Sequence, residues 1–339
     1  MGFLSYSLVY FTGELAALET APASQETVYH ARQLLKMLDD LRDEGYLGLN
    51  DALEASCQGV SRLRAHLAAR HVPPFPLPAG MPGEAEYGPQ TVELTEALRD
   101  LAAAARESRE SSDNAFLPEL ARFCQWVGYR EDTAYLFLLR DTLLPYLYYR
   151  ERGRANLHPW LLGRRTLAEL TGREDADDGF RAAIYRALER GEDGDFPRFR
   201  TAVLSDMRAA LRQYPAAEER LTALLRSVRA ERILVVESGC CGTFPLLLMS
   251  LDDRVDLRMY TTYPYLRQAY GDRIYSPRYE ENRLFETLRS QDRYFQFAGM
   301  EGERFYVRIC RDPEIRRRSW GEVKAFLDLV PSGGGGEVL

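Results

Sequence analysis

The chain of 339 residues carries a formal net charge of −7, and it is 45% hydrophobic and 11% aromatic. This composition is ample for a packed core and predicts a globular protein of one large or two ordinary domains. The acidic balance argues against general binding to nucleic acid, because a polyanion does not attract a net-acidic surface. The apolar runs are far shorter than the ~20 residues that a transmembrane helix needs, so no membrane association is expected.

The number and spacing of cysteines and histidines indicate the cellular compartment and whether a metal site is expected. Five cysteines, an odd number without framework spacing, predict a reducing, cytoplasmic location. The four histidines are scattered and no Cys/His cluster occurs, so no dedicated protein metal site is expected. The pattern contains no indication of an oligomeric state.

The first 130 residues are expected to form a mainly helical region. An aromatic, β-prone stretch over residues 3 to 11 is followed by apolar residues at helical spacing from Ser24 to Arg70. A Pro- and Gly-rich linker covers residues 72 to 89, and helical patterns resume in TVELTEALRDLAAAARES and FLPELARFCQWVGY.

The pattern changes at AYLFLLRD, where the expected core of residues 131–330 begins. A continuous apolar run from Ala134 is typical of a strand buried on both faces. The helical segment TLLPYLYYRERG and a second apolar run, HPWLLGRR, follow it. This β-α-β order predicts an α/β protein with a Rossmann-like parallel sheet as its core.

Helical patterns over residues 167 to 230 are expected to interrupt the sheet as a helical insertion of three helices. The sheet pattern returns with RILVVE and VDLRMYTTY, which flank a helix from about Phe244. A hairpin turning at Met300 to Gly302, a last helix around Trp320 to Leu329 and a flexible tail over residues 331–339 complete the chain.

A loop of small residues, SGCCGT, joins the strand RILVVE to the next helix. In open α/β sheets, ligands bind beyond the carboxyl ends of strands, where loops lead into helix N-termini. Glycines let backbone N–H groups approach an anion, and Thr243 adds a hydroxyl donor. The loop is therefore interpreted as a phosphate cradle; the alternative is that Gly239 and Gly242 only make a tight turn.

Two further polar segments are expected at the same edge of the sheet. Residues 140 to 142 follow the first predicted strand, and Arg164 and Arg165 follow the second. Paired arginines can clamp a phosphate or pyrophosphate through bidentate hydrogen bonds. The alternative is a surface ion pair with Asp141 or with Glu169.

This order of elements resembles that of the type I phosphoribosyltransferases. The resemblance rests on LLRDTLLP, the GRR pair and ESGCCGT, and covers about residues 133 to 166 and 231 to 263. It implies a small-molecule ligand that is a phosphorylated sugar or nucleotide, transfer of a (phospho)ribosyl group, and assistance by Mg²⁺.

The resemblance also implies roles for individual residues. The first loop and the basic pair would contact pyrophosphate, the acid at the later strand end would bind the ribose, and the loop after it would hold the 5′-phosphate. The implied catalytic residues are Glu237, Asp141 and Arg140, and the implied ligand-binding residues are Ser238, Gly239, Cys240, Cys241, Gly242, Thr243, Thr142, Arg164 and Arg165.

Two alternatives stay open. The family usually has two adjacent acids where this chain has Glu237 followed by Ser238, which favours a non-catalytic nucleotide-sensing or interaction module that keeps the cradle. The tract from Tyr260 to Glu286 is rich in tyrosine and arginine and could stack a base. Packing of those tyrosines against the sheet edge is the favoured interpretation.

Overall fold

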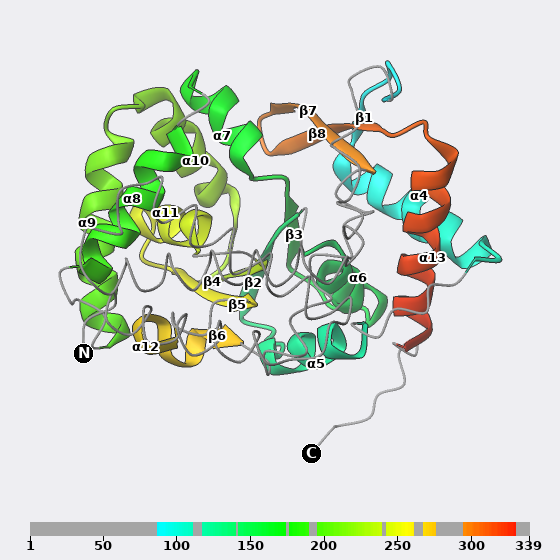
Figure 1. Cartoon of the computed structure of the whole chain (residues 1–339), viewed down its shortest axis with the longest axis horizontal. Helices are drawn as coiled ribbons and strands as arrows, with labels where there is room; N and C mark the ends of the chain where they lie inside the picture. The colour runs from blue at the N-terminus through cyan, green and yellow to red at the C-terminus, as the bar shows by residue number, and fades with distance from the viewer. Residues whose placement is uncertain are drawn as a thin grey trace, which may run out of the picture.

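The computed structural model of the chain describes residues 87–110, 117–139, 142–173, 176–189, 195–238, 242–260, 267–275 and 294–329 (Figure 1). The strand expected over residues 3 to 11, the helices expected between Ser24 and Arg70, most of the linker and the tail over residues 331–339 lie outside the described residues.

A parallel sheet of five strands lies at the centre (Figure 1). All neighbouring pairs are parallel. The α/β class and the parallel sheet predicted from the sequence are thus confirmed. In spatial order the strands are β3 (Leu157–Trp160), β2 (Thr133–Leu138), β4 (Arg232–Ser238), β5 (Val255–Tyr260) and β6 (Ile274–Tyr275).

The strand order reverses between β2 and β4. From β2 the chain passes to β3 on one side, returns to β4 on the other side of β2, and continues outward to β5 and β6. Both strands adjoining the reversal are largely buried, and β2 is buried at all six positions. Helices cover both faces of β2, which explains why its sequence is a continuous apolar run and not an alternating one.

The helices of the described residues surround this sheet. These helices are α4 (Leu94–Glu107), α5 (Leu117–Val127), α6 (Leu143–Glu151), α7 (Arg164–Thr171), α8 (Ala176–Glu189), α9 (Phe196–Leu211), α10 (Pro215–Ser227), α11 (Thr243–Leu251), the short α12 (Arg267–Tyr270) with the 3-10 turn η3 (Gly271–Arg273), and α13 (Pro313–Leu329). Among the described residues, no helix combines the length and the apolar character that crossing a bilayer requires.

Ring contacts show which helices cover which face. The Phe137 ring of β2 lies 5.6 Å from the Tyr149 ring of α6, and the Phe123 ring of α5 lies 5.4 Å from the Tyr260 ring of β5. The sheet register places Phe137 and Tyr260 on the same face, so α5 and α6 share that face. The opposite face carries α11, which packs on β5, α8, α9 and α10 (Figure 1).

Four helices, α7 to α10, connect β3 to β4. Three of them, α8, α9 and α10, coincide with the three helical patterns read from the sequence. The fourth, α7, begins at Arg164, before the expected start of the insertion. The last helix, α13, begins at Pro313 rather than near Trp320, because Asp312 accepts hydrogen bonds from the first-turn N–H groups and proline suits the first helical position.

A second, antiparallel sheet has the order β1-β8-β7. Its strands are β1 (Val92–Glu93), β7 (Phe295–Glu301) and β8 (Arg304–Ile309). The predicted hairpin is confirmed, but its turn lies at Gly302, with φ 57°, and Glu303, because Met300 and Glu301 pair with Phe305 and Arg304. The pairing of β1 with β8 was not predicted, since two residues carry no periodicity. Helix α13 packs on α4, α5 and α6, and these helices share one hydrophobic core with the parallel sheet.

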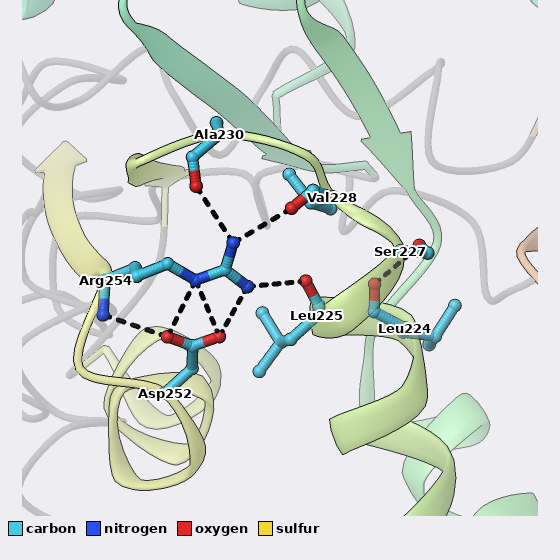
Figure 2. Close-up of polar contacts among 7 residues, drawn as sticks. All are labelled: Leu224, Leu225, Ser227, Val228, Ala230, Asp252 and Arg254. Atoms are coloured by element: carbon cyan, nitrogen blue, oxygen red, sulfur yellow. Dashed lines mark hydrogen bonds and ion pairs between the residues drawn. The ribbon is translucent and has the colours of Figure 1, made fainter.

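Arg254 joins two connections at the amino edge of the sheet (Figure 2). Its Nη1 donates to the carbonyls of Val228 and Ala230 at 3.0 and 2.9 Å, and its Nη2 donates to that of Leu225 at 2.9 Å. The guanidinium also forms an ion pair with Asp252, 2.7 Å from Nη2 to Oδ2, which lowers the pKa of that carboxyl. All five guanidinium donors are thereby used to fix the turn before β4 to the turn before β5.

We expect Arg254→Lys to lower the free energy of unfolding by about 1 to 3 kcal/mol, because an ammonium cannot satisfy three carbonyls and a carboxylate in this planar arrangement. Urea denaturation monitored by circular dichroism measures the change. Arg232→Lys, at the exposed first position of β4, is the matched control and should change stability little. Equal losses in the two variants would contradict the role given to Arg254.

Candidate functional site

The carboxyl ends of β2 and β4 meet at the reversal of strand order. The connection that leaves β2 enters α6, and the connection that leaves β4 enters α11. These helices lie on opposite faces of the sheet (Figure 1). Two helix N-termini therefore flank one point at the sheet edge, and each carries the partial positive charge of its helix dipole.

Glu237 and Ser238, the last two residues of β4, point to opposite faces of the sheet. Ser238 is aligned with Tyr260 and therefore shares the face of α5 and α6. Glu237 is aligned with Met259 and shares the face of α11; its side chain is half-buried. The sequence analysis placed Glu237 at the strand end and Ser238 in the loop after it; in the structure both belong to β4, and their side chains point to opposite faces of the sheet.

The Ser238 hydroxyl is buried at the edge of the sheet. The residue is 1% exposed, and its Oγ has no hydrogen-bond partner among the described residues. Burying a hydroxyl without a partner costs about 1 to 3 kcal/mol. A group that carries such a cost at a strand's carboxyl end is a candidate for binding a ligand.

Gly242 makes the turn into α11. It adopts φ 75°, a left-handed conformation that favours glycine, as the N-cap of the helix. A Cβ atom at this position would lie 3.1 Å from the Tyr270 hydroxyl and 3.3 Å from the Met259 sulfur. The tight-turn alternative accounts for Gly242. Thr243 is the buried first residue of α11, and Pro245 lies in the first turn, where its missing N–H breaks no helical bond.

The remaining residues of the predicted cradle, Gly239, Cys240 and Cys241, lie outside the described residues. The same holds for Arg140 and Asp141 after β2. Their implied roles in binding and catalysis stay predictions.

Thr142 is fully buried at the start of α6. Its Oγ1 donates to the carbonyl of Leu138 at 2.8 Å, which fastens the beginning of the helix to the end of β2. The hydroxyl proton is therefore used by the protein backbone. Thr142 shapes the loop that was predicted to bind pyrophosphate, and only its remaining acceptor capacity is available to another group.

Arg164 and Arg165 are the first two residues of α7. The strand β3 ends at Trp160, so three residues separate the basic pair from the strand end. The sequence analysis placed the pair directly at the strand end. The helix dipole opposes positive charge at a helix N-terminus, and α7 has no acidic residue in its first turn. The description does not extend to the side chains of this pair.

A buried polar cluster that the sequence did not reveal lies under the neighbouring strand ends. Glu119 of α5 is 3% exposed and accepts hydrogen bonds from the Tyr275 hydroxyl and from Arg122. Burial first, and then the bond to Glu119, raise the pKa of Tyr275. The spacing of Glu119 and Arg122 on one helix face was visible in the sequence, but 156 residues separate Glu119 from Tyr275.

Two tyrosines of the tract that begins at Tyr260 are core residues. Tyr260 and Tyr270 are fully buried, and the Tyr270 ring lies 5.1 Å from the Phe199 ring of α9. Packing is the role that the structure gives to these two. Other tyrosines of the tract, including Tyr279, lie outside the described residues.

The described residues contain no group of three or more His, Cys, Asp or Glu side chains that could hold a metal ion. Mg²⁺ commonly binds to one or two carboxylates together with substrate phosphates. The residues at the switch point would therefore hold Mg²⁺ only when a phosphorylated ligand is also bound. Glu237 is the carboxylate at the switch point that could take part.

Comparisons of the chain with protein-family models, curated protein sequences and solved structures find no match. The phosphoribosyltransferase resemblance therefore stays a prediction.

We expect Gly242→Ala to destabilise the protein by about 2 to 4 kcal/mol, because it combines a left-handed conformation with a close contact to Tyr270 and Met259. Gly172→Ala is the matched control: φ is 70° there, and nothing lies within 4 Å of its Cβ position. That variant should lose only about 1 kcal/mol, which is the cost of the left-handed conformation alone. Urea denaturation compares the two, and equal losses would show that the packing around Gly242 does not matter.

Proposed function

We propose that the switch point between β2 and β4 binds a phosphorylated ribosyl compound or a nucleotide. The observation that carries this proposal is the reversal of strand order, with α6 and α11 leaving adjacent strands toward opposite faces. In open α/β sheets this is the position at which ligands bind, and phosphate groups favour the N-termini of helices.

The strand order supports the Rossmann-like part of the proposal. When the strands are numbered by their sequence within the parallel sheet, the order is 2-1-3-4-5, one of the two common orders of doubly wound nucleotide-binding sheets. Such folds serve many chemistries, so the order supports a class of ligand and not a reaction.

Local chemistry at this edge supports an anionic ligand. The buried Ser238 hydroxyl would donate a hydrogen bond to a ligand oxygen. The N-terminus of α7, which follows β3, would favour a bound phosphate through its helix dipole.

Transfer of a ribosyl group is the finer part of the proposal and rests on the resemblance. It requires preorganised charge to stabilise an oxocarbenium-like state and a leaving pyrophosphate. Mg²⁺ would supply charge neutralisation on the phosphates. Glu237 would hold the ribose hydroxyls, since a carboxylate accepts their hydrogen bonds.

The second candidate function is nucleotide sensing without catalysis. Two observations favour it: Glu237 is followed by Ser238 instead of a second acid, and the Thr142 hydroxyl proton is already used by Leu138. Both reduce the number of polar groups that could act on a ribose or a pyrophosphate.

Isothermal titration with phosphoribosyl pyrophosphate and Mg²⁺, beside an assay for pyrophosphate release, tests the proposal. We expect binding by the wild-type protein and at least about tenfold weaker binding by Glu237→Ala. Glu231→Ala, which removes an exposed acid just before the other end of β4, is the charge-matched control. Binding without pyrophosphate release would support the sensor, and absence of binding by the wild-type protein would overturn both functions.

Ser238→Ala separates a ligand role from a structural one. Without ligand, the variant should be as stable as the wild-type protein or more stable by about 1 kcal/mol, because it removes a buried hydroxyl that has no partner among the described residues. With ligand, its affinity should fall. Thermal unfolding with and without phosphoribosyl pyrophosphate measures both effects. A loss of stability in the free protein would indicate a structural hydroxyl and count against the site.

A further inference from the structure

A groove of about 440 Å³ lies between α9 and the C-terminal end of α11. It is lined by Arg200, Arg208 and Arg212, by the hydroxyl residues Thr201 and Ser205, and by Leu204, Ala209, Met249 and Asp253. Three positive side chains face one negative side chain. In a protein of net charge −7, this is a local concentration of positive charge.

Two of these arginines contact the C-terminal end of α11 or the turn after it. Arg208 donates from Nε to the carbonyl of Ser250 at 2.9 Å and also donates to it from Nη2. Arg200 lies 3.6 Å from Asp253, whose side chain is 97% exposed. An ion pair with such an exposed acid is weak, so Arg200 could exchange it for a bound anion at little cost.

Arg212 completes the basic wall of the groove. Among the described residues the structure gives its side chain no ion pair or hydrogen bond, and the residue is exposed. It lies one helical turn beyond Arg208, and Arg200 lies about 12 Å before Arg208 along the axis of α9 at ~1.5 Å per residue. A single phosphate cannot contact guanidinium groups spread over this length as well as an elongated anion can.

We propose that this groove binds a small molecule with two or more linked phosphate groups. Guanidinium groups match phosphate oxygens through paired hydrogen bonds, and Ser205 provides an additional hydroxyl donor. The volume lies within the range of small-molecule sites. The groove is at the opposite end of α11 from Gly242, so it is separate from the switch point and does not depend on the proposed function.

Arginine modification read by mass spectrometry tests the proposal on the wild-type chain. Phenylglyoxal reacts with accessible guanidinium groups, and the rate can be followed at each arginine. Inorganic pyrophosphate should slow modification of Arg200 and Arg212 severalfold and leave Arg198, which is exposed on the same helix but does not line the groove, unchanged. The same protection experiment with ATP in place of pyrophosphate shows whether the groove binds a nucleotide or a free diphosphate.

Variants give the second measurement. Arg200→Gln with Arg212→Gln should weaken pyrophosphate binding about tenfold or more in isothermal titration. Arg198→Gln with Arg229→Gln removes the same charge from exposed positions outside the groove and should have little effect. Equal protection of Arg198 and Arg212, equal protection by sulfate at the same concentration, or equal affinity of the two double variants would overturn the proposal. The Ser238→Ala variant should keep full protection in the groove, so failure at one site is distinguishable from failure at the other.

Discussion

The constraint on which the rest of the structure depends is the burial of β2 and β4 on both faces. A strand covered on both sides needs helices above and below it, and right-handed crossovers then determine where each connection goes. The chain satisfies this by sending α6 to one face and α7 to α11 to the other. The switch point is a direct consequence of that arrangement, and its position follows from packing before any ligand is considered.

The two edges of the sheet are built differently. At the amino edge, Arg254 fills the space between two connections and satisfies carbonyls at the end of α10 (Figure 2). At the carboxyl edge, Ser238 lacks a partner among the described residues, and Gly242 holds a left-handed turn. The hydrogen bonds of Arg254 thus fasten the sheet at the edge opposite the switch point.

Much of the parallel sheet could be predicted from the sequence, because continuous apolar runs mark strands covered on both faces. The hairpin and the helices α8 to α10 also follow from local periodicity. The pairing of β1 with β8 could not be predicted, since it joins two residues to a strand over 200 positions away. For the site, the sequence indicated Gly242 as a turn glycine, but not that Glu237 and Ser238 face opposite sides, nor that Glu119 meets Tyr275. Those depend on register and tertiary contact.

The pairing of β1 with β8, and of α4 with α13, also governs when the fold can be completed during synthesis. Residues 92 to 107 leave the ribosome early, but their partners are made more than 190 residues later. Until then the apolar side of α4, which includes Leu98 and Leu101, lacks its contacts with β8 and α13. The nascent chain must therefore carry this surface through most of translation, a period in which chaperones commonly protect such segments.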